Sequence, residues 1–233
     1  MSIGYRDKLS SGRRAMAHLI HIWHERNAWS HKVLPILSEE LDLGRVHNSQ
    51  ISNLRNGKLS SPGPEVFLAL AQVNTILDRG IELIRDQLED KHPELWRTLV
   101  ESSSPLKNDA GKPLSAGELF EIFSGLQPLP SSFDWFIEDE EASKLSEALS
   151  DHFCRNLPWR YCKNDIMSAY SVTKLSRRDR FAEVIAGIRD YSAEELDGEL
   201  LDLYETSRNL SFFDKGGPNA FLKELRKMIS SKK

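Results

Sequence analysis

The chain has 233 residues, of which 39% are hydrophobic and 28% charged, a composition typical of folded proteins and not of disordered ones. This length fits one large domain or two small ones. No apolar run approaches the ~18 residues of a membrane span and no secretory leader is evident, so we expect a cytoplasmic protein without membrane contact. Cys154 and Cys162, the only cysteines, are too few for a disulfide scaffold; with only His152 nearby, they do not form a zinc motif.

Charge is distributed unevenly along the chain, whose formal net charge is −4. Residues 1–63 contain nine Lys and Arg and five Asp and Glu, which gives +4, and the remainder therefore carries −8. A basic N-terminal part joined to an acidic C-terminal part is typical of a DNA-contacting module carried by a second domain.

Helical periodicity dominates the first hundred residues. We expect a first helix over about 12–28, and a second that begins at Ser30 or at Pro35 and ends at Gly44. A short helix follows over 48–56, with Gly57 directly after it. Residues 64–89 read as one helix broken at Gly80 or as two helices, and 93–100 as a further amphipathic helix.

Residues 101–113 interrupt this pattern with a polar stretch, ESSSPLKNDAGKP, that contains two prolines and a glycine. Such a composition predicts an exposed linker between domains. At least five more helices are expected after it. Ser115 with Glu118 and Ser192 with Glu195 have the spacing of capping boxes and mark two helix starts.

The short helix over 48–56 is the most informative segment. Ile51 and Leu54 can be buried on one side, while the other side carries side chains that hydrogen-bond bases and phosphates. Asn and Ser are poor helix formers, so their concentration here is unusual for an ordinary surface helix. We interpret Gln50 and Asn53 as readers of base edges and Arg45, Arg55 and Lys58 as phosphate contacts. The full predicted DNA-binding set is Arg45, Asn48, Ser49, Gln50, Ser52, Asn53, Arg55 and Lys58.

Residues 45–70 resemble the Cro/phage-repressor helix-turn-helix family, also called the XRE family. The resemblance rests on NSQISNLRNGK, then SSP, then EVFLALA, preceded by HERNAWSHKVL, and covers roughly 15–75. It implies that the short helix reads DNA. The sequence departs from the family pattern in three places. Gly44 lies fourteen positions after Ser30 where about nine are usual, an extra Arg45 follows Gly44, and Arg55 stands where many members have Glu.

Other motifs have less specific readings. His21 and Glu25 are one helical turn apart and could share a metal, although an exposed or phosphate-facing histidine is more common. The acidic run 137–141 is typical of the first turn of a helix. Trp96, Trp135, Trp159 and Tyr161 could line a ligand pocket, but core packing is the usual role of such residues. We find no nucleophile–base arrangement and no cofactor motif, so neither an enzyme nor a cofactor is expected.

We therefore predict an all-α protein with a helix-turn-helix DNA-binding domain over 1–100 and a second helical bundle over 114–233 for dimerisation, partner binding or sensing. The predicted function is sequence-specific binding of double-stranded DNA by a homodimeric transcriptional regulator. The alternative is an adaptor whose helix-turn-helix fold binds protein and not DNA.

Overall fold

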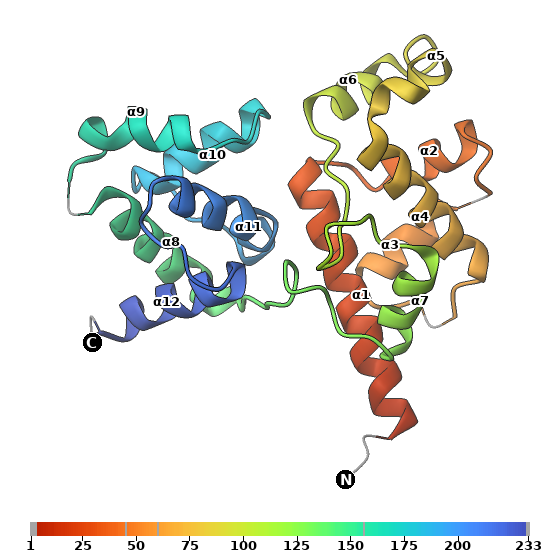
Figure 1. Cartoon of the computed structure of the whole chain (residues 1–233), viewed down its shortest axis with the longest axis horizontal. Helices are drawn as coiled ribbons and strands as arrows, with labels where there is room; N and C mark the ends of the chain where they lie inside the picture. The colour runs from red at the N-terminus through yellow and green to blue at the C-terminus, as the bar shows by residue number, and fades with distance from the viewer. Residues whose placement is uncertain (1–3, 45, 60, 156, 232–233) are drawn as a thin grey trace. The chain divides into compact units, whose positions relative to one another are not determined.

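The computed structural model describes residues 4–44, 46–59, 61–155 and 157–231 (Figure 1). Within these ranges the secondary structure is helical, with a single isolated bridge between Lys107 and Pro113 and no β-strand. The all-α prediction is confirmed. The chain divides into two compact units, unit 1 over 1–130 and unit 2 over 131–233. No helix in the described part of the chain is long and apolar enough to cross a membrane.

Unit 1 contains seven α-helices and one 3-10 helix within its described residues. They are α1 (Tyr5–Asn27), α2 (Val33–Glu40), α3 (Asn48–Arg55), α4 (Pro64–Arg79), η1 (Ile81–Ile84), α5 (Arg85–Leu88), α6 (Pro93–Glu101) and α7 (Ala116–Ser124). The core is formed by apolar side chains of α1 to α4 that are almost fully buried, among them Leu19, Trp23, Leu34, Leu37, Ile51, Leu54, Leu70 and Val73. Burial of these faces stabilises helices that would be marginal alone.

The second helix begins between the two expected starts. It opens at Val33, so that Pro35 falls within its first turn, where the missing backbone N–H would have no intrahelical acceptor. It also ends earlier than Gly44. Asp42 adopts a left-handed conformation with φ 52°, and the N–H of Leu43 donates to the carbonyl of Ser38 at 2.9 Å. This hydrogen bond closes the helix in the manner of a Schellman motif.

The first helix is longer than predicted because α7 packs against it (Figure 1). Gly12 lies so close to the end of α7 that an added Cβ would come within 2.4 Å of the Phe123 carbonyl oxygen. Gly125, with φ 71°, approaches the Lys8 carbonyl in the same way. The early turns of α1 have no apolar periodicity and are held by this contact, which the local sequence does not signal.

The predicted linker at 101–113 is part of unit 1. Leu106 and Leu114 are buried, and two buried asparagine amides hold the backbone of this segment. Asn74 on α4 accepts from the Leu106 N–H at 2.7 Å and donates to the Leu106 carbonyl at 2.8 Å. Asn27 on α1 bonds the N–H and carbonyl of Ser104. The division between the units therefore lies after Pro130 and not at 101–113, because the polar segment is fixed by long-range hydrogen bonds.

Unit 2 contains five helices within its described residues: α8 (Asp139–Cys154), α9 (Trp159–Ala169), α10 (Leu175–Ile185), α11 (Ala193–Asn209) and α12 (Pro218–Ser231). The acidic run does form the first turn of α8, as expected. A buried ionic cluster joins α10 to α11: the guanidinium of Arg177 donates to Glu199 at 2.6 and 2.7 Å and to Asp202 at 2.7 Å. Both oxygens of Glu199 are engaged, so this cluster fastens helices together and presents no reactive group.

The four aromatic residues that could have lined a pocket differ in unit and in burial. Trp135 and Trp96 are buried, the first in unit 2 and the second in unit 1. Trp159 is half-buried, and Tyr161 is exposed.

Candidate nucleic-acid interface

Helix α3 is anchored by its apolar side and presents its polar side to solvent. Ile51 is fully buried and Leu54 is 2% exposed, and the helix packs against α1 and α2. The helix ends as the sequence predicts: Gly57 adopts φ 65°, and the N–H groups of Lys58 and Leu59 both donate to the Asn53 carbonyl. The orientation of α3 is thus set by two apolar side chains and a glycine stop.

Four of the eight predicted contact residues are exposed, three on α3 and one after its end. Asn48, Ser49, Asn53 and Lys58 are exposed, while Gln50 and Ser52 are half-buried. Ser49 and Asn53 are four residues apart and therefore share one face. Arg45 lies outside the described residues.

Gln50 has a structural role at the start of the helix. Its Oε1 accepts a hydrogen bond from the backbone N–H of His47 at 2.9 Å, which completes the reciprocal capping of α3. Bidentate recognition of adenine uses the same oxygen together with the amide nitrogen. Gln50 would have to release His47 to read a base in this way, whereas the side chain of Asn53 stands exposed on the helix surface.

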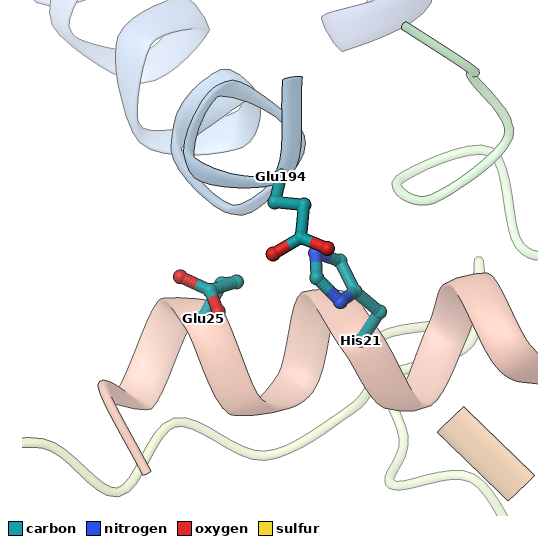
Figure 2. Close-up of side chains that lie close together, drawn as sticks. All are labelled: His21, Glu25 and Glu194. Atoms are coloured by element: carbon teal, nitrogen blue, oxygen red, sulfur yellow. The ribbon is translucent and has the colours of Figure 1, made fainter. Parts of the chain in front are cut away.

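Arg55 connects α3 to α1. Its Nε donates to Nδ1 of His21 at 3.0 Å, and its Nη2 donates to Oε1 of Glu25 at 3.1 Å. Figure 2 shows His21 and Glu25 one turn apart on α1; Glu194, drawn in the same figure, belongs to unit 2 and is not part of this group. The guanidinium bridges the two side chains that the sequence suggested as metal ligands. Because the Arg55 guanidinium already bonds both His21 and Glu25, we assign no metal ion to these two side chains.

His24, one turn after His21 on α1, is fully buried. Its Nδ1 donates to the Ile20 carbonyl oxygen at 2.8 Å. Burial lowers the pKa of His24 to about 4, so this side chain stays neutral and adds no positive charge near α3 at neutral pH.

Two features beside α3 were not evident from sequence. Arg14 is exposed on α1, one turn before Ala17, whose methyl group would be 3.8 Å from a Cβ built on Gly57. A shallow groove of about 280 Å³ also lies between α2 and the start of α3. Its lining residues are Lys32, Pro35, Ile36, Glu39, Val46, His47 and Asn48. The first feature depends on the packing of α1 against α3, and the second on the packing of α2 against α3.

The charge contrast between the two parts is weaker when the true boundary is used. Residues 1–130 contain fifteen Lys and Arg and sixteen Asp and Glu, so unit 1 has a net charge of −1, and unit 2 has −3. The excess of +4 is confined to 1–63, which includes α1, α2 and α3. Basic character is therefore a property of one part of unit 1.

The structure thus defines an all-α protein of two helical units, the first of which exposes a polar helix. Residues 6–125 match the family model described as "Domain of unknown function (DUF8644)", and residues 142–233 match "Domain of unknown function (DUF8645)". The first match spans slightly more than half of the chain, so the chain belongs to the DUF8644 family. Its limits fall within unit 1 and those of the second within unit 2. No curated protein and no solved structure matches the chain.

Proposed function

We propose that this protein binds double-stranded DNA in a sequence-specific manner through α3 and acts as a transcriptional regulator. The observation that carries the proposal is the polar, solvent-exposed face of α3, built from Asn48, Ser49 and Asn53 and followed by Lys58. Amides and hydroxyls of this kind bond base edges and phosphates, whereas an ordinary surface helix has no reason to accept their low helix propensity.

The arrangement of α2 and α3 supports a helix-turn-helix of the Cro/phage-repressor type. The two helices are consecutive and pack on each other, and α3 is seated on α1 by Ile51 and Leu54. The connection over 41–47 is longer than the ~3–4 residues usual in this motif, which agrees with the long spacing from Ser30 to Gly44. A dimer is part of the proposal, since one recognition helix reads few base pairs and two half-sites ~34 Å apart give usable affinity.

The proposed roles follow from the environment of each side chain. Asn53 is exposed and is the principal base reader, with Asn48, Ser49 and Ser52 as supporting polar contacts. Lys58 neutralises a phosphate at the end of α3, and Arg14 is positioned to do so from α1. Arg45 keeps its proposed phosphate role from sequence alone.

The test is a salt titration of binding to a duplex selected from random DNA. Lys58→Ala should flatten the slope of log K against log salt by about one while leaving base preference unchanged, because one phosphate contact is lost. Asn53→Ala should cost about 1–3 kcal/mol and relax preference at one base position. Lys112→Ala removes an equally exposed lysine from the 108–112 turn and should change neither. If the parent protein bound no duplex even at low salt, the DNA-binding proposal would fall.

A second candidate function, an adaptor that binds another protein, is favoured by the groove beside α3. Its lining includes the apolar Pro35, Ile36 and Val46 and the exposed, oppositely charged Lys32 and Glu39. A lining that combines apolar and charged side chains suits a partner side chain. Absence of DNA binding together with loss of a partner on Ile36→Asp would establish this function in place of the first.

A further inference from the structure

The two cysteines of the chain, Cys154 and Cys162, meet within unit 2. Cys154 is the last residue of α8 and is buried, and Cys162 lies in the first turns of α9 and is half-buried. Their sulfur atoms are 3.5 Å apart. A disulfide requires about 2.05 Å, so the two atoms need to approach by only a small distance.

The surrounding structure can supply that movement. Between the two cysteines, Arg155 adopts a left-handed conformation with φ 48°, and the N–H of Leu157 donates to the Cys154 carbonyl at 2.8 Å. The start of α9 thus lies close to the end of α8, and the two helices are in contact. Ile166 is the only buried residue of α9, so the start of this helix is lightly held and can shift toward Cys154.

We propose that Cys154 and Cys162 are a redox modification site that forms a reversible intrachain disulfide and fastens the start of α9 to the end of α8. The oxidant is a low-molecular-weight disulfide such as oxidised glutathione. The bond converts a loosely held helix start into a fixed one. This site is independent of the proposed DNA-binding face, because its residues all belong to unit 2.

The order of reaction follows from accessibility and ionisation. Burial raises the pKa of the Cys154 thiol to about 12, so the more exposed Cys162 reacts first. The Cys162 thiolate attacks one sulfur of glutathione disulfide, which forms a mixed disulfide and releases one glutathione thiolate. Cys154 then gives up its proton to solvent, and its sulfur attacks that of Cys162. The second glutathione leaves, so two protein thiols are oxidised and one disulfide is reduced to two thiols.

The test uses the full-length protein in glutathione buffers of increasing oxidation, followed by alkylation of free thiols, denaturation and digestion with trypsin. Arg155 and Arg160 lie between the two cysteines, so trypsin separates them into different peptides. An intrachain bond joins residues 145–155 to residues 161–163 without forming a covalent dimer. The expected result is the loss of both titratable thiols and recovery of this linked pair, reversed by dithiothreitol.

Variants separate a reactive pair from two thiols that merely pack together. In Cys154→Ser, oxidation should stop at the mixed disulfide between glutathione and Cys162. In Cys162→Ser, the Cys154 thiol should remain and react slowly. Cys154→Ala replaces Cys154→Ser if the serine variant loses helicity. In the native protein, oxidation should slow trypsin cleavage after Arg155 and Arg160, and Cys154→Ser should abolish that protection. Stable glutathione adducts or covalent dimers in place of the linked peptides, or thiols that remain free throughout, would overturn the proposal.

Discussion

The contacts of Arg55 within unit 1 compete with its predicted role in binding a DNA phosphate. The resemblance and the basic character of residues 1–63 suggested a phosphate contact, yet its guanidinium is half-buried between His21 and Glu25 of α1. Its Nε and one Nη2 hydrogen already donate to these two groups, in competition with a phosphate. Lys58, by contrast, is exposed at the end of the same helix. The two basic residues are therefore expected to contribute differently.

A double-mutant cycle tests this assignment. Arg55→Ala should lower the free energy of unfolding of the protein, and its coupling to Glu25→Gln should be about 0.5–1 kcal/mol, the range for a partly exposed ion pair. The measurement is urea unfolding of the parent, both single variants and the double variant. If Arg55 were a phosphate contact instead, Arg55→Ala would weaken DNA binding and flatten its salt dependence, and the two substitutions would act on stability independently.

Helix ends were predicted well wherever the signal is local. Ser115 with Glu118 and Ser192 with Glu195 form the expected capping boxes, and Gly57 and Gly80 adopt the positive φ angles that end α3 and α4. These signals lie within a few residues of the structure they determine. The polar face of α3 was likewise visible, because the periodicity of Ile51 and Leu54 places it.

Contacts between distant segments could not be predicted in this way. The segment 101–113 has the composition of an exposed linker, but Asn27 and Asn74, which hold its backbone, lie about 77 and 32 residues earlier in the sequence. A lone asparagine within a helix does not reveal what it will bind. For the same reason the Gly12–α7 contact and the hydrogen bonds of Arg55 to α1 were seen only in the folded chain.

The hydrogen bonds from Asn74 to the segment 101–113 give a prediction about the stability of unit 1. Asn74→Ala would remove the partner of the Leu106 N–H and of the Leu114 carbonyl in a buried environment, while the Leu106 carbonyl would still accept from the Leu114 N–H. We expect a loss of about 2–4 kcal/mol in the free energy of unfolding, since each buried polar group left unsatisfied costs about 1–3 kcal/mol. Gln72→Ala, an exposed position on α4, is the matched control and should change little. A loss no larger than that of the control would show that the segment is held by other contacts.

At the scale of the whole molecule, the position of the boundary decides which fragments can fold. Unit 1 needs α7, because α7 covers both α1 and α4 and its end meets Gly12. The family match over 6–125 includes this helix and ends directly after it. The second match, over 142–233, contains most of unit 2 but leaves out the start of α8 and the buried Phe133, Trp135 and Ile137.

Fragments test this division. Residues 1–130 should form a helical unit with cooperative thermal unfolding, whereas residues 1–100 should not, because removal of α7 exposes the buried Phe67, which packs against Phe120 and Phe123 of that helix. Residues 131–233 should fold cooperatively, and residues 142–233 should be less stable because they lack the buried aromatic residues that precede α8. Circular dichroism during heating distinguishes these cases. Equal stability of 1–100 and 1–130 would place the boundary between the two units at 101–113. It would also mean that Asn27 and Asn74 bind a segment that the stability of unit 1 does not require.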